Sequence, residues 1–87
     1  MKIEKVIITN ITREKIFDKH NLQKVEIEQT IFEGNPVYLK TRSNKYLCIG
    51  YKNQYVTLVF NREENNAKII TAYKSSKWQI RLYKRKK

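Results

Sequence analysis

The residues of this chain that could do chemistry are concentrated at its carboxyl end. Residues 68–87 contain eight Lys or Arg and no Asp or Glu, whereas the other 67 residues hold the remaining 11 basic and all 8 acidic side chains. Tyr73, Trp78 and Tyr83 are interleaved with these cations. Cations that neutralise phosphates, placed beside rings that stack on bases, are typical of proteins that bind single-stranded nucleic acid. We therefore expect this segment to bind a phosphate-bearing partner.

His20 is the only histidine, and histidine is the side-chain type that titrates nearest neutral pH. It is therefore a candidate general base. It also follows Phe17 on a segment with helical periodicity, and a helix that packs on a sheet would turn it inward. We expect an interior, hydrogen-bonded histidine and keep the catalytic role as the alternative.

Metal and cofactor chemistry has little support in the sequence. Cys48 is the only cysteine and lies in an apolar run, so it has no disulfide partner and indicates a reducing compartment. One Cys and one His cannot make a zinc site of ordinary stoichiometry. Glu63 and Glu64 share a predicted turn and make only a weak case for a divalent metal. We expect no metal and no other cofactor.

The length predicts one domain, residues 1–87, with a modest margin of stability. An apolar content of 40% is enough for one core. The apolar run at residues 6–8 is too short for a secretion signal or a membrane span. No long amphipathic helix flanked by Lys and Arg is present to lie on a membrane surface. The sequence therefore predicts a cytoplasmic protein without a membrane partner.

A first helix is predicted around Ile16, Phe17 and His20, after a short extended arm at residues 2–8. Thr12 is suited to cap its start, and the three residues share one face. Asn21 tolerates the left-handed backbone conformation that ends such helices.

A second helix is predicted through about Phe32. Ile27 and Ile31 are four residues apart, and Val25 and Phe32 are seven apart, as on one side of a helix. The sequence Gly-Asn-Pro at residues 34–36 stops it.

A helix is also predicted at the carboxyl end. Ser76 and Gln79 have the spacing of a capping box. Trp78 and Leu82 share a face of this helix, and we expect Trp78 to anchor it to the core. Residues 84–87 are interpreted as a mobile, solvated extension.

Between the second and the last helix the pattern changes to runs rich in Val, Ile, Tyr, Phe and Thr, separated by polar stretches. Four strands are predicted, at residues 37–40, 45–51, 55–61 and 68–73. In the third of these runs, alternation assigns Val56, Leu58 and Phe60 to the core. In the fourth, alternation does not settle which face is buried. The fold class is α+β: two N-terminal helices packed on a four-stranded antiparallel sheet, with a C-terminal helix.

Six short motifs fall in the order and spacing of the BrnT toxins, and the resemblance spans residues 12–83. The motifs are KHNL (19–22), IFEGNP (31–36), KYLCIG (45–50), LVFNRE (58–63), KIITA (68–72) and RLY (81–83). None is specific alone, but the ordered set resembles that family.

The resemblance implies a RelE/ParE-like fold and the role of toxin in a type II toxin–antitoxin pair. It implies metal-independent cleavage of single-stranded mRNA, which inhibits translation. It also implies a ribbon-helix-helix (BrnA-like) antitoxin as partner, together with RNA, and a dimer within the toxin–antitoxin complex.

Metal-free RNA cleavage needs a base for the 2′-hydroxyl, an acid for the 5′ leaving oxygen, and cations around the transition state. Two sets of candidate residues follow from the positions that match the family and from side-chain chemistry. The catalytic candidates are Lys68, Arg81, Tyr83, Tyr73 and His20. The RNA-binding candidates are Arg62, Lys74, Lys77, Lys84 and Arg85.

Two departures from the family pattern keep other functions open. Tyr73 stands where the family has Arg, and the Glu-Arg of the turn is Arg62-Glu63 here, in reversed order. The first departure favours a non-catalytic nucleic-acid-binding module on the same scaffold. A third reading, a gyrase poison on this fold, predicts growth arrest with intact RNA and damaged DNA.

Overall fold

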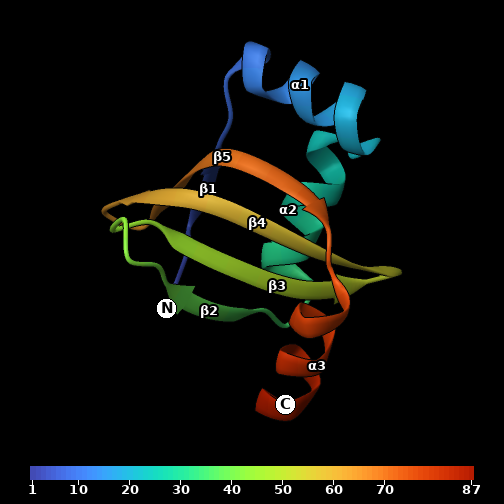
Figure 1. Ribbon diagram of the computed structural model, residues 1–87. Helices are drawn as coiled ribbons and strands as arrows, with labels where there is room; N and C mark the ends of the chain where they lie inside the picture. The colour runs from blue at the N-terminus through green and yellow to red at the C-terminus, as the bar shows by residue number, and fades with distance from the viewer.

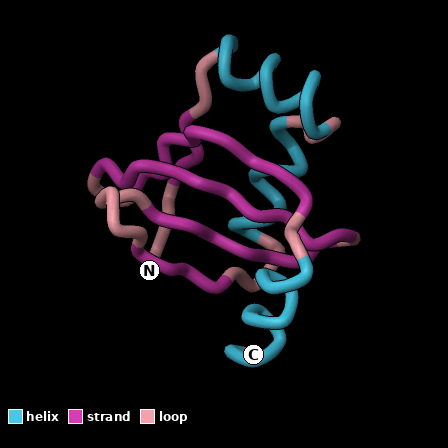
Figure 2. Tube along the Cα trace, viewed as in Figure 1, coloured by secondary structure: helices cyan, strands magenta, loops and turns pink.

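One mixed sheet of five strands, in the order β1-β5-β4-β3-β2, runs through the computed structural model, which describes all 87 residues (Figures 1 and 2). In Figure 1, α2 passes behind the strands, and α3 descends from the end of β5 at one end of the sheet. The elements are β1 (Lys5–Ile7), α1 (Asn10–His20), α2 (Lys24–Phe32), β2 (Val37–Lys40), β3 (Tyr46–Lys52), β4 (Gln54–Glu63), β5 (Asn66–Lys74) and α3 (Lys77–Lys86).

The sheet has one strand more than the four predicted. The expected extended arm contains β1, which pairs in parallel with β5, from Lys5 opposite Asn66 to Ile7 opposite Lys68. The prediction of a wholly antiparallel sheet was therefore wrong at this edge. A strand of three residues has no periodicity to read. It is held in place because Ile3 is buried in the core and Glu4 donates its N–H to the carbonyl oxygen of Asn65 at 2.7 Å.

The main core lies between the sheet and the two N-terminal helices. Val56, Leu58 and Phe60 of β4 are buried there, which confirms the predicted face of that strand. From α2, Ile27 and Ile31 join them, while Val25 and Phe32 are exposed. The predicted apolar face of α1 was wrong, because Ile16 alone is buried and Phe17 is 46% exposed.

A β-bulge in β5 explains why alternation did not settle its faces. The pairing shifts between Val59 and Phe60, so that these neighbours on β4 oppose Thr71 and Ile69, and Ile70 is left as an extra residue. Ile69 and Ala72, three apart, therefore both enter the core. Lys68, Thr71 and Tyr73 consequently lie on the other face of the sheet, opposite the face that Ile69 and Ala72 share with the core.

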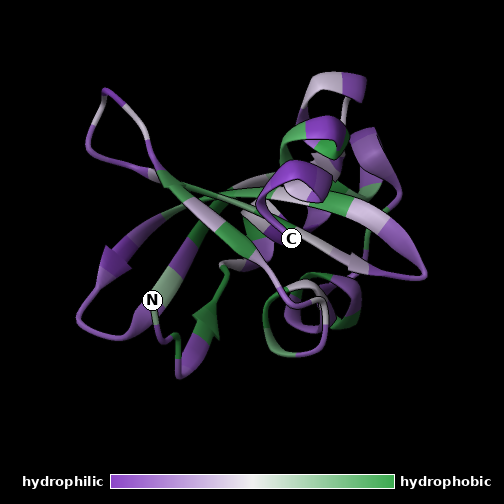
Figure 3. Cartoon of the chain, turned by 90° about the horizontal axis from the view of Figure 1, so that it is seen from below, coloured by the Kyte–Doolittle hydropathy of each residue, from purple (hydrophilic) through white to green (hydrophobic).

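The second face of the sheet is covered only in part. A row of cross-strand neighbours, Val37, Ile49, Thr57 and Tyr73, lies beneath α3. The next row, which α3 leaves half-buried, consists of Leu39, Leu47, Val59 and Thr71. Figure 3 shows apolar residues concentrated along the strands, while the last turns of α3 are hydrophilic.

α3 is anchored by polar side chains and not by Trp78. Gln79 and Tyr83 are its buried residues, whereas Trp78 is 54% exposed, so the predicted anchor was wrong. The capping box of Ser76 and Gln79 is confirmed. The helix continues to Lys86, and Lys84 lies 5.9 Å from the ring centre of Tyr55, so residues 84–87 are not a plain extension.

The ends of α1 are defined by two caps. The side chain of Thr9, and not that of Thr12, caps its start, accepting from the backbone N–H of Thr12 at 3.2 Å. Asn21 ends it in the left-handed conformation, with φ 55°, as predicted. α2 ends at Phe32, also as predicted.

Close backbone contact between α2 and β3 makes Gly50 a sensitive position. A Cβ at Gly50 would lie 2.6 Å from the backbone oxygen of Thr30 and 2.9 Å from its Cγ2. We expect Gly50→Ala to lower the free energy of unfolding by about 3 kcal/mol, because a backbone oxygen cannot move aside as a flexible side chain can. Urea denaturation measures this. Asn61→Ala, at an exposed position on β4, is the control and should change stability by less than ~0.5 kcal/mol. Equal stability of Gly50→Ala and wild type would contradict the close packing.

Candidate active site and nucleic-acid interface

His20 and Tyr73, from distant parts of the chain, meet in a groove where the end of α1 reaches the end of β5. Their ring centres are 6.0 Å apart with the planes inclined at 48°. The groove has a volume of about 490 Å³ and is lined by Lys19, His20, Asn21, Tyr73 and Lys74. It therefore brings together His20, Tyr73 and Lys74 from the predicted set, and adds Lys19 and Asn21, which the sequence did not suggest.

The groove exists because β5 has a free outer edge. β1 pairs with β5 only as far as Lys68, so the later part of this edge has no strand beside it. α1 lies along that part instead, and its end at Asn21 sets His20 beside Tyr73. A smaller hollow between α1 and β5 continues from the groove and shares Lys19 and His20 with it.

The hydroxyl of Tyr73 is positioned by a buried amide. Gln79 donates from Nε2 to the Tyr73 oxygen at 2.8 Å. Its Oε1 accepts from the backbone N–H of Ser76 at 2.9 Å and from the hydroxyl of Thr57 at 3.0 Å. Because the N–H of Ser76 can only donate, the amide oxygen must face it, and the amide nitrogen must face Tyr73. The Tyr73 oxygen thus receives a hydrogen bond, and its own proton is not donated to any acceptor within the chain.

Positive charge at the groove is not neutralised by carboxylates. The chain has only two ion pairs, Lys52 with Glu33 at 3.3 Å and Lys68 with Glu63 at 4.0 Å. Lys19 and Lys74 are therefore free to face a phosphate. Their ammonium groups, one Tyr O–H and one imidazole are a suitable set for general acid–base chemistry on a phosphodiester.

His20 is half-buried and makes no hydrogen bond within the chain, so the prediction of an interior, hydrogen-bonded histidine was wrong. Its ring lies at the edge of the sheet because α1 packs along the β5 edge, with only Ile16 turned into the core. The position leaves both ring nitrogens available to a ligand.

Three predicted residues lie outside the groove. Lys68 is beside Glu63 at the other end of β5. Arg62 is held within the β4–β5 turn, donating from Nε to the carbonyl oxygen of Glu64 at 2.7 Å and to the side chain of Asn65. Tyr83 is buried and donates to the carbonyl oxygens of Gly34 and Asn35, fixing α3 to the α2–β2 turn. Burial raises the pKa of Tyr83, with smaller contributions from Tyr55 and Cys48.

The remaining predicted cations form a ridge on α3. Lys77, Arg81 and Arg85 recur every fourth residue, so they share the outer side of the helix, and all three are exposed. Lys84 is on the flank toward Tyr55. None of the four is paired with a carboxylate.

The sequence was compared with known proteins at three levels. No protein-family model matches it, and no curated protein sequence does. Among solved structures, the 1.1 Å crystal structure of the Brucella abortus ribonuclease toxin, BrnT, is similar, with a TM-score of 0.68 over 84% of this chain and 97% of that one, at 18% identity. The chain has a BrnT-like fold. The resemblance inferred from the six motifs is thus confirmed for the fold.

Within this BrnT-like fold, Gln79 is the residue of the candidate site that the sequence did not reveal. The capping box identified it only as a helix-start residue. One signal could have indicated its role. Gln79 is a polar residue between Trp78 and Tyr83, at the centre of the side of α3 that is buried. Lys19 carried a weaker signal, as the cation next to the only histidine.

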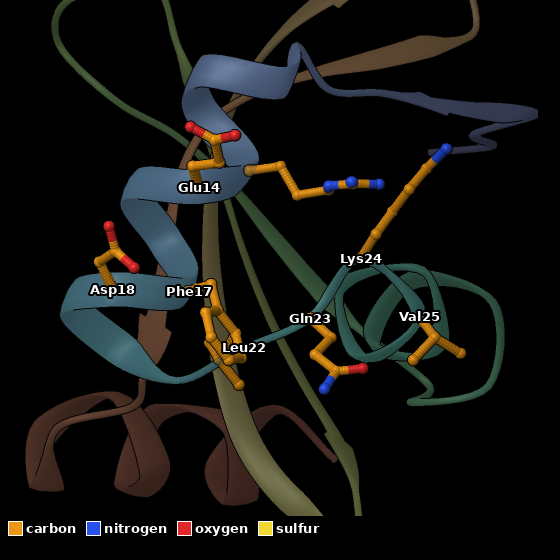
Figure 4. Close-up of a pocket in the computed structure, with 8 residues that line it drawn as sticks. Glu14, Phe17, Asp18, Leu22, Gln23, Lys24 and Val25 are labelled. Carbon is orange, nitrogen blue, oxygen red and sulfur yellow. The ribbon is translucent and has the colours of Figure 1, made fainter.

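A larger hollow lies elsewhere on the BrnT-like fold, between α1 and α2, with a volume of about 560 Å³ (Figure 4). Its apolar residues are Phe17, Leu22 and Val25. Glu14 and Asp18 project from α1 at its rim. Two cations, Arg13 and Lys24, balance these carboxylates, so the hollow has no excess of positive charge to attract phosphates and we do not place the nucleic-acid site there.

No group of three or more His, Cys, Asp or Glu side chains could hold a metal ion. No helix is both long enough and apolar enough to cross a bilayer.

Cys48 is expected to be unreactive in the folded protein. It is fully buried, and burial raises the pKa of its thiol to about 12, so the reactive thiolate is scarce at pH 8. Alkylation by iodoacetamide, followed by mass spectrometry, should be slow in buffer and fast in urea. Ser43→Cys, in an exposed loop, supplies a matched thiol that should react in buffer. If Cys48 reacted as fast as that thiol, the buried position would be wrong.

Gln79→Leu should destabilise the protein by about 2–3 kcal/mol, because Thr57, Tyr73 and the N–H of Ser76 lose their partner below α3. Gln29→Leu is the matched control, since that side chain on α2 makes no hydrogen bond and should cost less than ~0.5 kcal/mol. Urea denaturation compares the two, and equal losses would remove the special role of Gln79.

Proposed function

We propose that this chain is the toxin of a type II toxin–antitoxin system, a ribonuclease that cuts single-stranded mRNA without a metal ion and so inhibits translation. The observation that carries the proposal is the groove in which His20 faces Tyr73 between Lys19 and Lys74. The BrnT-like fold supports it, because the similar structure is that of a ribonuclease toxin.

In the proposed reaction, the 2′-hydroxyl of the RNA attacks the adjacent phosphorus. His20 takes the proton of that hydroxyl, and the new O–P bond replaces the bond to the 5′ oxygen of the next nucleotide. Tyr73 protonates the leaving oxygen, and the hydrogen bond that Gln79 donates to the Tyr73 oxygen stabilises the phenolate that results. Lys19 and Lys74 stabilise the charge that develops on the phosphate oxygens. The products are a 2′,3′-cyclic phosphate and a 5′-hydroxyl.

The other cations have a binding role in this proposal. Lys77, Arg81, Lys84 and Arg85 of α3 contact the RNA backbone next to the groove. Lys68 contacts it further along the open face of the sheet. Tyr83 is a structural residue here, because its hydroxyl is fully engaged below α3.

The proposed partner is a ribbon-helix-helix antitoxin. Acidic or apolar segments of such a protein would complement the cations of α3 and exclude RNA, with dimerisation of the pair in the complex. We propose that both proteins act in the cytoplasm. A reading frame for a ribbon-helix-helix protein next to the gene is the simplest supporting observation.

A second function, binding of nucleic acid without cleavage, is favoured by one observation. The family resemblance has Arg at the position of Tyr73, and the groove contains no arginine. A binding module would show affinity that falls steeply with salt and would leave RNA intact.

The test is incubation of the purified protein with single-stranded RNA, with and without EDTA. We expect cleavage in both, with a cyclic phosphate end. His20→Ala and Tyr73→Phe should each slow cleavage by about 100-fold or more, the size typical of a lost general acid or base. Tyr51→Phe, an exposed tyrosine away from the groove, is the matched control and should cut normally. RNA left intact where a known ribonuclease toxin cuts would reject the enzyme and leave the binding module.

A further inference from the structure

Trp78, the only tryptophan, is the feature that the proposed reaction leaves unexplained. It lies on the first turn of α3 and is 54% exposed, although the same helix has two buried positions. Those positions are taken by Gln79 and Tyr83. Unlike the exposed rings of α1 and α2, Trp78 lies among cations with no carboxylate near it in the sequence, a combination that suits stacking on a base of a nucleic acid.

The contacts of α3 show which way Trp78 faces. At 100° per residue, Trp78 and Leu82 are on one flank of the helix, and Lys84 and Lys87 are on the other. Lys84 lies over Tyr55, beside the β3–β4 turn, and Lys87 donates to the side chain of Asn35. The flank of Trp78 therefore faces away from that turn and toward the uncovered part of the sheet.

The uncovered part of the sheet forms a floor beside Trp78. It is the row of Leu39, Leu47, Val59 and Thr71, paired across β2, β3, β4 and β5 and half-buried throughout. Leu82 packs on the cluster of Val37, Ile49 and Tyr83, next to this row. Because α3 follows β5 directly, Trp78 lies near the Thr71 end of the floor, the end closest to Tyr73.

The charge around Trp78 indicates what binds there. Lys74, Lys77 and Arg81 precede and follow it, and all are exposed and free of ion pairs. No Asp or Glu follows Glu64 in the sequence. An acidic, ring-bearing ligand fits this surface, whereas a second copy of this chain would bring its own excess of positive charge.

We propose that Trp78 is a base-stacking platform that holds one unpaired base of a single-stranded nucleic acid beside the His20–Tyr73 groove. The platform selects single strands, because bases inside a duplex are already stacked and cannot lie on the ring. The proposal deepens the proposed function by assigning the residue that recognises its substrate class, but stacking does not require that the strand be cut.

The test uses a 2′-O-methyl RNA decamer, which cannot be cut through a 2′-hydroxyl, and follows the fluorescence of Trp78. We expect saturable quenching by the decamer and much weaker quenching by the same sequence in a duplex. By fluorescence anisotropy of a labelled decamer, Trp78→Ala should lower affinity between about 5-fold and 100-fold, and Trp78→Phe should retain most of it. Phe17→Ala, at a similarly exposed ring near the carboxylates of α1, should bind as wild type.

Salt dependence separates stacking from charge. Trp78→Ala should leave the slope of log affinity against log salt unchanged, whereas Lys77→Ala should reduce it by about one. Circular dichroism and urea denaturation check that the variants fold.

The platform would be overturned if Trp78→Ala bound the decamer with unchanged affinity, or if the decamer did not change the fluorescence of Trp78. If the fluorescence of Trp78 changed with protein concentration and not with added decamer, the platform would also be overturned, and the surface would instead be one through which copies of this chain associate. The uncuttable decamer keeps this outcome separate from that of the cleavage assay. A protein that stacks the decamer but leaves RNA intact rejects the ribonuclease alone.

Discussion

The buried amide of Gln79 is the contact on which the arrangement of the second sheet face depends. It joins the start of α3 to β4 through Thr57 and to β5 through Tyr73, while the N–H of Ser76 fixes which way the amide points. A buried amide with every partner in place specifies one geometry, because any other leaves a polar group unpaired. The same contact places α3 across one end of the sheet and leaves the hydroxyl proton of Tyr73 without an acceptor in the chain. Anchorage of the helix and preparation of the groove are therefore one feature of the structure.

Partial cover of the sheet separates two surfaces of different charge. The helical layer is neutral overall, because α1 and α2 carry four carboxylates (Glu14, Asp18, Glu26 and Glu28) and four cations (Arg13, Lys15, Lys19 and Lys24). The last strand and α3 carry cations without carboxylates, except at the far end of β5, where Glu63 meets Lys68. A longer α3 packed through Trp78 would bury more apolar surface and close the open row. Instead, the ring of Trp78, the half-buried row from Leu39 to Thr71 and the cations of α3 lie together on one face, as expected of a surface that binds a ligand.

Sequence patterns predicted the parts of this structure that local chemistry determines. The strand at Val37–Lys40, the capping box of Ser76 and Gln79, the left-handed Asn21 and the core face of β4 all follow from residue type and spacing. Long-range pairing determines the rest. β1 forms because it pairs with the edge of β5, and the bulge at Ile70 depends on the register between β4 and β5. Periodicity within one segment reveals neither kind of pairing. The same limit applies to the site: helical periodicity placed His20 inside and Trp78 at an anchor, because it could not show that α1 packs along an edge or that a glutamine occupies the buried side of α3.

The central claim is that the His20–Tyr73 groove cuts RNA by attack of the 2′-hydroxyl. The most direct measurement uses an oligonucleotide of deoxynucleotides with a single ribonucleotide, incubated with the protein in EDTA and analysed by mass spectrometry. Our account predicts one cut, on the 3′ side of the ribonucleotide, leaving a 2′,3′-cyclic phosphate and a 5′-hydroxyl, and no cut in the all-deoxy control. Cleavage of the all-deoxy strand would contradict it. So would a mixed strand that stays intact while single-stranded RNA is cut, under the same conditions, to ends other than a cyclic phosphate.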